Sequence, residues 1–141
     1  LLAGVKTRGI YLAQRIAAKL ASRRQVPPVL ELDVTPWRDD VPRTDAPLPD
    51  LDPRIAGATV IIVDDVLYTG RTVRAAIEAI SHRGRAERIQ LAVLVDRGHR
   101  ELPLRPDYIG QNLPTARDER RFVRLTEVDG EDSVNIQARN P

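Results

Sequence analysis

Two adjacent acids, Asp64 and Asp65, follow an apolar run over residues 60–63, and a Thr-Gly-Arg-Thr turn over residues 69–72 comes shortly after them. The turn offers hydroxyls, a glycine that lets a ligand approach the backbone closely, and successive N–H groups at the start of a helix, and these suit a phosphate. Carboxylates beside it suit ribose hydroxyls or a hydrated magnesium ion. The spacing therefore predicts a site for a sugar phosphate.

The same residues have a second interpretation, in which Thr69 or Thr72 only caps a helix and the acids only favour its positive end. Two adjacent acids that cap nothing else favour the ligand site. Neither G-x-x-x-x-G-K-[ST] nor G-x-G-x-x-G occurs, so a P-loop nucleotidase and a Rossmann dinucleotide enzyme lose their main support.

Strands and helices alternate along the chain and would position these residues. Apolar runs predict strands over residues 1–5, 29–34, 59–63 and 88–95, with three shorter ones over 107–110, 122–128 and 133–137. One helix has an apolar face made of Ile10, Ala13, Ile16, Ala17 and Leu20. A second begins near Arg71, buries Val73, Ala76, Ile77 and Ile80, and is stopped by Gly84.

This alternation predicts an α/β fold with a parallel sheet covered on both faces. The runs over residues 60–63 and 91–95 are continuous, as expected for strands buried on both faces. The first of them should end at Val63, which would place Asp64 and Asp65 beyond the carboxyl edge of the sheet, where ligands bind in such folds. Residues 36–57 carry many prolines and no periodicity, which indicates a mobile loop.

The composition of the 141 residues fits one globular domain, with 42% hydrophobic and 30% charged residues. There is no cysteine and there are only two histidines, which argues against a transition-metal site. No apolar run could cross a bilayer and no leader is recognisable, so we expect a cytoplasmic protein with no membrane partner. Arginine greatly outnumbers lysine, which favours a polyanionic partner, although genome base composition or heat adaptation would give the same bias.

Residues 60–72, "VIIVDDVLYTGRT", resemble the motif that binds 5-phosphoribosyl 1-diphosphate (PRPP) in type I phosphoribosyltransferases. Within that superfamily, "VDDVLYTGRTVRAA" and "LVDRGHRELPLRPDYIGQNLPT" resemble the PyrR family of pyrimidine operon attenuators that also act as uracil phosphoribosyltransferases. The similarity extends from "KTRGIYLAQRIA" to "VDGEDSV".

The resemblance implies a type I phosphoribosyltransferase fold, which is a mainly parallel sheet flanked by helices, with a small β hood. It implies one domain over residues 1–141 that lacks an N-terminal helix and strand, and a mobile loop at about 38–55 that includes Arg38 and Asp39. It also implies uracil transfer from PRPP to give UMP and pyrophosphate, with Mg²⁺ held mainly through PRPP and not bound directly by the protein.

The site residues follow from the same resemblance. Asp64 and Asp65 would be catalytic and hold the ribose hydroxyls. The loop expected to hold pyrophosphate is Lys6, Thr7, Arg8 and Gly9, unless it is only a surface turn. The remaining PRPP or UMP contacts would be Val66, Leu67, Tyr68, Thr69, Gly70, Arg71 and Thr72.

The nucleobase and RNA contacts are less specific. Uracil would meet Arg97, unless this is a solvated loop arginine, and the backbone near Val123. RNA would meet Arg100, Arg105 and Gln111, the last in place of a lysine, unless these charges are ordinary surface. The expected partners are PRPP, uracil, UMP or UTP, a pyrimidine operon mRNA leader, and further copies in a homodimer or higher homo-oligomer. The alternative is a purine or orotate phosphoribosyltransferase without RNA binding.

Overall fold

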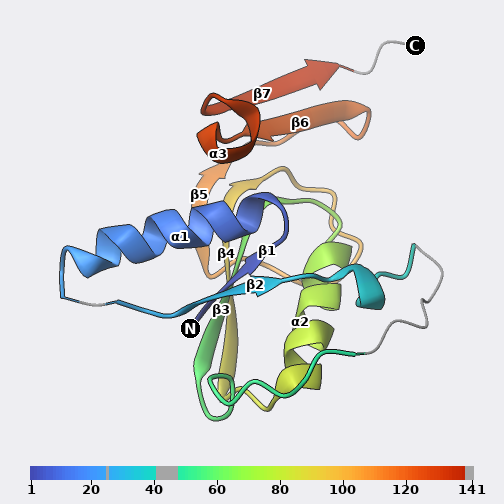
Figure 1. Cartoon of the computed structure of the whole chain (residues 1–141). Coiled ribbons are helices and arrows are strands. Elements are labelled where there is room, and N and C mark those ends of the chain that lie inside the picture. The colour runs from blue at the N-terminus through green and yellow to red at the C-terminus, as the bar shows by residue number, and fades with distance from the viewer. Residues whose placement is uncertain (25, 41–47, 139–141) are drawn as a thin grey trace.

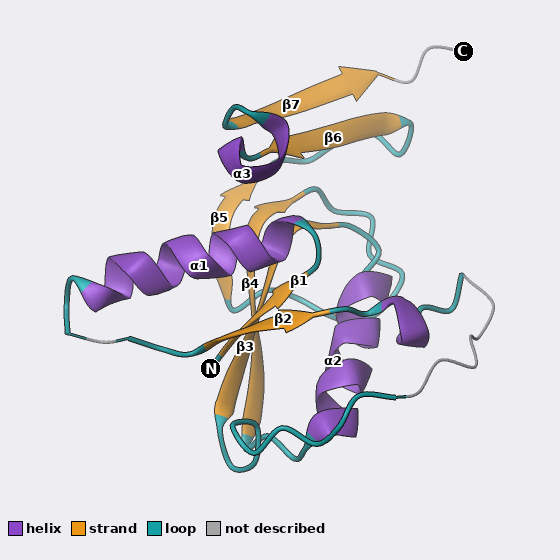
Figure 2. Ribbon diagram, viewed as in Figure 1, coloured by secondary structure: helices purple, strands orange, loops and turns teal. Residues whose placement is uncertain are grey.

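The computed structural model describes residues 1–24, 26–40 and 48–138 and contains a five-stranded parallel sheet in the order β2-β1-β3-β4-β5 (Figure 1). Its strands are β1 (Leu2–Val5), β2 (Val29–Leu32), β3 (Thr59–Leu67), β4 (Arg88–Asp96) and β5 (Tyr108–Asn112). Helix α1 (Arg8–Ala21) covers one face and α2 (Arg71–Arg83) covers the other (Figure 2). The predicted α/β class is confirmed, and the strand order reverses between β1 and β3.

The face of the sheet that α2 covers is the more completely buried of the two. As predicted, α2 buries Val73, Ala76 and Ile80 and ends at Gly84, while the fourth predicted residue, Ile77, is only half-buried. The buried side chains of α2 pack against Val60, Ile62, Leu91 and Val93 of the central strands. Ile55 is also fully buried in this cluster, so the end of the predicted mobile loop packs against the core. Residues 41–47 of that loop lie outside the described residues.

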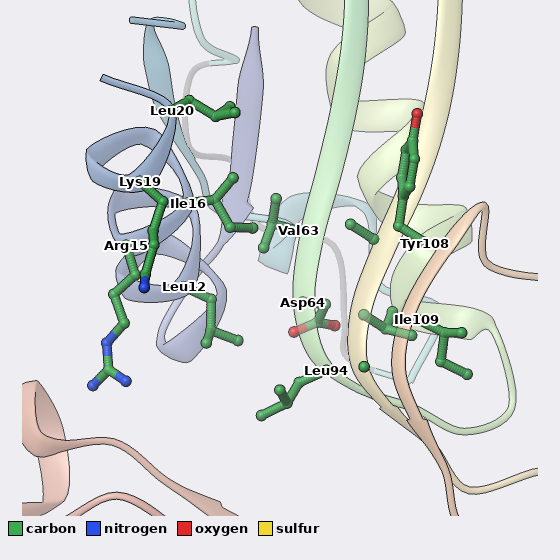
Figure 3. A pocket seen from close by; sticks show the side chains of 13 residues that line it. Leu12, Arg15, Ile16, Lys19, Leu20, Val63, Asp64, Leu94, Tyr108 and Ile109 are labelled. Atoms are coloured by element: carbon green, nitrogen blue, oxygen red, sulfur yellow. The ribbon is translucent and has the colours of Figure 1, made fainter. Parts of the chain in front are cut away.

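The α1 face is only partly covered. Of the predicted apolar face, helix α1 buries Ile10 and Ala13, whereas Ile16 is 37% exposed. Ile16 borders a groove of about 450 Å³ whose floor includes Ala92, Leu94 and Ile109 (Figure 3). The prediction that β4 is buried on both faces is wrong, because Ala92 and Leu94 are only half-buried.

Strand β3 is longer than predicted. The prediction that the strand ends at Val63 is wrong, because β3 continues to Leu67. The reason is its neighbour: β4 pairs with β3 as far as Leu67 opposite Asp96, whereas β1 pairs with it only as far as Val63. Past Val63, β3 is paired on one side only among the described strands.

A small hood stands at the carboxyl end of the sheet (Figure 1). It consists of antiparallel strands β6 (Glu119–Arg124) and β7 (Ser133–Ala138), joined through the short helix α3 (Thr126–Asp129). The strand predicted over residues 122–128 is thus divided between β6 and α3, while β5 and β7 match the other two short predictions. Val123 and Leu125 are buried against Val95, which provides the apolar part of the hood's attachment.

Candidate functional site

Two loops meet at the point where the strand order reverses. The first follows β1 and carries Lys6 and Thr7 into the start of α1, and the second follows β3 and carries residues 68–70 into the start of α2. In a parallel sheet of this order, ligands bind at the carboxyl ends of the strands beside the reversal. The topology therefore brings the predicted phosphate and pyrophosphate loops to one edge of the sheet.

The phosphate loop, residues 68–72, presents backbone donors. Gly70 is the N-cap of α2, with a φ of 94° that favours glycine, and no side chain caps this helix. Thr69 Oγ1 accepts a hydrogen bond of 3.3 Å from the Arg71 N–H, while Thr72 is exposed. Neither threonine is the N-cap residue, and the free N–H groups and positive end of a thirteen-residue helix suit an anion.

The loop between β4 and β5 packs along the phosphate loop. The N–H groups of Glu101 and Leu102 both donate to the Thr69 carbonyl, at 2.9 and 3.2 Å. The guanidinium of Arg71 contacts Glu101 at 3.0 Å and also Asp39, within the predicted mobile loop, at 2.9 Å. Arg38 pairs with Asp40 and is exposed. Two other segments, the loop between β4 and β5 and the segment that carries Asp39, therefore contact and stabilise the phosphate loop.

The two acids have different surroundings. Asp64 is 8% exposed, and Figure 3 shows it near Leu12 and Leu94 at one end of the groove. Burial raises the pKa of the Asp64 carboxyl well above its usual value, and the charge of Asp65 raises it further. Asp65 is half-buried, and its Oδ1 accepts a bond of 2.8 Å from the Val66 N–H. Asp65 is therefore the more accessible of the two carboxylates.

The predicted pyrophosphate loop combines exposed and buried parts. Lys6 and Thr7 are exposed, the peptide bond between them is cis, and Arg8 forms an ion pair of 2.9 Å with Asp129 of α3. Gly9 is buried, and a Cβ there would lie 2.3 Å from the carbonyl oxygen of Val63. Only glycine lets α1 begin this close to β3. Close packing therefore explains why residue 9 is glycine, which the surrounding sequence did not reveal.

The predicted base contacts lie at the junction of the sheet and the hood. Arg97 is 8% exposed; its Nε donates to Thr115 Oγ1 at 3.1 Å and its Nη2 to the carbonyls of Ala116 and Glu119. A cavity of about 510 Å³ lies beside it, lined by Asp96, Arg97, Gly98, His99, Asn112, Pro114 and Thr115. Val123 is buried in β6 and does not line this cavity. The solvated alternative for Arg97 is wrong.

The other predicted residues divide into inward and outward positions. The side chain of Leu67 is buried in the core and Val66 packs against the cluster of Val95, Val123 and Leu125, so a ligand would meet Val66 and Leu67 only through their backbone. Arg105 and Gln111 are exposed, as an RNA contact must be. Arg100 is half-buried and bonded to three acceptors within the chain, which turns it away from solvent.

Sequence reasoning missed the side chains that attach the hood to α1. Arg15 donates to Glu127 at 3.0 Å and to Asp132 at 2.8 and 3.1 Å, next to the pair between Arg8 and Asp129. The Arg15 guanidinium holds the pKa values of Glu127 and Asp132 below their usual range. The available signal was the cluster of acids over residues 127–132, together with Arg8 in the predicted loop and Arg15 in the predicted helix that follows it.

The described residues contain neither a cluster of metal-ligating side chains nor a membrane-spanning helix. Within residues 1–24, 26–40 and 48–138, no three His, Cys, Asp or Glu side chains gather as a protein-built metal site would require. In the same part of the chain, no helix has the length and apolarity to cross a membrane.

Comparison with known proteins identifies the class. A model of the phosphoribosyl transferase domain matches residues 1–129. The solved structure of the hypoxanthine phosphoribosyltransferase of Trypanosoma cruzi superimposes with a TM-score of 0.69 at 20% identity, over 99% of this chain and 75% of that one. The protein thus has the type I phosphoribosyltransferase fold.

Sequence relatives identify the family more closely. The bifunctional protein PyrR of Halalkalibacterium halodurans is 51% identical over 144 residues, covering 97% of this chain and 80% of that protein. The pyrimidine operon regulatory protein of Lactococcus lactis subsp. lactis is 54% identical over 137 residues, covering 96% and 79%. The chain belongs to the PyrR family of phosphoribosyltransferases.

Proposed function

We infer that this protein regulates pyrimidine operon transcription and is also a uracil phosphoribosyltransferase that makes UMP and pyrophosphate from uracil and PRPP. The observation that carries the enzymatic part is the meeting of two anion-binding loops and a carboxylate pair where the strand order reverses. The names of relatives at 51% and 54% identity carry the regulatory part.

The phosphate loop binds the 5-phosphate of PRPP or UMP in this proposal. The N–H groups at the start of α2 and the exposed hydroxyl of Thr72 donate to the phosphate oxygens. Lys6 and the backbone of Thr7 and Gly9 bind the pyrophosphate at the neighbouring strand end. Arg8 neutralises it from the side, with its guanidinium anchored by Asp129. The ribose then lies between the loops, close to Asp65.

The reaction breaks the bond between C1 of the ribose and pyrophosphate, whose oxygen takes the electron pair. A ring nitrogen of uracil forms the new bond to C1 and releases its proton to water. Positive charge develops on the ribose, and the Asp65 carboxylate stabilises it from a fixed position. Asp64 is buried with a raised pKa, so we assign it to shaping the strand end and not to direct contact with the ribose.

Magnesium fits this site as a companion of the substrate. The described residues contain no three-ligand cluster, and Mg²⁺ commonly keeps several waters and binds through one or two carboxylates and substrate phosphates. When bound with PRPP, the ion neutralises charge on the leaving pyrophosphate.

The regulatory surface in this proposal is the outer side of the segment after β4. Arg105 and Gln111 are exposed there, and an arginine-rich surface can pin RNA phosphates or stack on splayed bases. Pairing of two copies in a homodimer would place two such segments on one particle and increase binding to a folded leader.

A panel of bases tests the function directly. We would incubate the protein with PRPP, Mg²⁺ and uracil, orotate, hypoxanthine or guanine, and measure pyrophosphate release. Uracil alone should give turnover. Turnover with a purine or orotate but not uracil would support the alternative enzyme, and RNA binding that UMP does not strengthen would contradict the regulatory part.

A further inference from the structure

We propose that Arg100 is a positioning residue that aims the phosphate loop at its ligand. The proposal rests on the proposed function in one respect, which is that residues 68–72 bind the phosphate of PRPP or UMP. Arg100 is predicted to contact RNA, and the bonds that its guanidinium makes within the chain support a role at the phosphate loop.

The Arg100 guanidinium joins three segments. Nε donates to the carbonyl of Leu104 at 2.8 Å, Nη1 donates to the carbonyl of Tyr68 at 3.0 Å, and Nη2 pairs with the Asp96 carboxylate. Asp96 ends β4, Leu104 lies toward the other end of the loop between β4 and β5, and Tyr68 opens the phosphate loop. The Arg100 and Asp96 side chains are 23% and 13% exposed, so solvent competes little for these bonds.

The bond to Tyr68 orients a peptide group of the phosphate loop. In a trans peptide the C=O and the following N–H point in opposite directions. Because Arg100 holds the Tyr68 carbonyl, the Thr69 N–H points away from the loop that carries Arg100. The Thr69 carbonyl is held in the same way by the N–H groups of Glu101 and Leu102, which turns the Gly70 N–H away as well.

Two successive N–H groups therefore face the side on which the phosphate would bind. Neither the Thr69 N–H nor the Gly70 N–H donates to a protein acceptor within the part of the chain that the structure describes. Successive N–H groups that converge in this way form an anion-binding nest. Arg100 fixes the direction of the first of them and also braces the loop that fixes the second.

Tyr68 is also held by its ring. The Arg97 guanidinium carbon lies 4.1 Å from the ring centroid, and the His99 ring meets it edge-on at 5.8 Å between centroids. Stacked and cation–π contacts of this kind restrict the ring. Because these contacts already restrict the Tyr68 ring, the main freedom left to Tyr68 is rotation of its peptide plane. The hydrogen bond from Arg100 to the Tyr68 carbonyl restricts that rotation.

The test compares Arg100→Ala and Arg100→Lys with Arg88→Ala, a control that removes an exposed arginine from the opposite end of β4. We would measure UMP and ribose 5-phosphate affinity by calorimetry, KM for PRPP and kcat for uracil transfer, and Tm. Arg100→Ala should weaken both ligands and raise KM for PRPP by about tenfold or more, as expected for loss of a charged hydrogen bond. Turnover at saturating PRPP should change less, because the phosphate is bound equally in ground and transition states.

Rescue distinguishes positioning from general stability. Arg100→Lys keeps the charge but cannot reach three acceptors, so its affinities should fall between those of the parent and Arg100→Ala. Guanidinium ion at low millimolar concentration should partly restore ribose 5-phosphate binding to Arg100→Ala and leave Arg88→Ala unchanged. Parent-like ligand affinity in Arg100→Ala would overturn the proposal. So would parallel losses of kcat, Tm and affinity in both Arg100 variants without rescue.

Ribose 5-phosphate separates this proposal from the proposed function, because it carries no base. A parent that binds ribose 5-phosphate but does not transfer uracil refutes the enzymatic function and leaves the Arg100 comparison decisive. A parent that binds neither ribose 5-phosphate nor UMP overturns both.

Discussion

The phosphate loop and the hood lie at the same end of the sheet but are held by different interactions. Backbone hydrogen bonds from the loop between β4 and β5, and a half-buried arginine, hold the phosphate loop. The hood has a small apolar contact through Val123 and Leu125, and most of its other attachments to α1 are ion pairs at the surface. Surface ion pairs contribute little and are screened by salt. The phosphate site should therefore be preformed, while the hood's position should depend on pH and ionic strength.

The largest expected effect is at the carboxylate beside the ribose. Asp65→Asn removes a charge while keeping shape, and should lower kcat for uracil transfer by about 100- to 1000-fold, the cost of removing one preorganised electrostatic group. Ligand binding through the phosphate loop should change much less. Asp118→Asn, on an exposed turn near the hood, is the matched control. Parent-like turnover in Asp65→Asn would remove this acid from the chemistry.

Gly9→Ala tests how closely the first loop approaches the sheet. An added methyl would lie 2.3 Å from the Val63 carbonyl oxygen, so either α1 or β3 must move. We expect a loss of about 3 kcal/mol in the free energy of unfolding, near the upper end for overpacking. Urea unfolding measures it, with Gln14→Ala on the exposed side of α1 as control. An unchanged midpoint would show that the helix start has room to shift.

Thr72→Val tests whether the phosphate loop binds through its side chains as well as its backbone. The substitution keeps the shape of the side chain and deletes the hydroxyl of an exposed residue in the first turn of α2. UMP affinity should fall by about 1.5 to 3 kcal/mol, the range for a hydrogen bond to a charged group. Thr59→Val, at the opposite end of β3, should bind as the parent does. Equal UMP affinity in all three proteins would leave Thr72 as an ordinary helical residue.

Asp64→Asn should stabilise the protein in a pH-dependent way. The folded-state pKa of Asp64 is raised, mainly by burial, so the folded protein holds this proton more tightly than the unfolded chain. Stability is therefore greatest below the unfolded pKa and declines as pH rises toward the folded one. Asn has no proton to lose and can still accept the bond from the Asp65 N–H. Its Tm should exceed the parent's by several degrees at neutral pH and approach it in acid, and a pH-independent difference would contradict this account.

The fold was largely predictable because it depends on local patterns. Apolar runs and 3.6-residue periodicity located the strands of the sheet and the buried face of α2. The exceptions depend on neighbours. The extension of β3 to Leu67 comes from the length of β4, and the exposure of Ile16 comes from the open groove beside α1. Neither the extension of β3 nor the exposure of Ile16 can be predicted from the sequence of β3 or of α1 alone.

The site was predictable in its loops and less so in its arginines. The motif over residues 60–72 located the phosphate loop, since the chemistry of a turn depends on adjacent residues. Whether an arginine faces solvent depends on which carbonyls come within reach after folding. Arg97 and Arg100 find theirs in segments up to 32 residues away, and Arg15 finds its acids 112 and 117 residues away. Position in the sequence gave no signal for the contacts of Arg97 and Arg100, whereas the acids over residues 127–132 were a signal for those of Arg15.

The smallest expected effect belongs to the hood and is the most sensitive to conditions. Arg15→Ala removes its pairs with Glu127 and Asp132, whereas Arg124→Ala removes a pair with Glu131 that lies within the hood. Amide hydrogen exchange of β6 and β7 should quicken in the first variant and not in the second. The difference should shrink in about 1 M salt, where the Debye length is about 3 Å.

The same ion pairs should make the hood depend on pH. Arg15 lowers the pKa values of Glu127 and Asp132, so the stability that it contributes is present above the unfolded-state pKa values of these acids and is lost as pH falls through their folded-state pKa values. In acid the parent should therefore exchange as fast as Arg15→Ala, and a hood whose exchange ignores salt, pH and Arg15 alike would be held by its apolar contact alone.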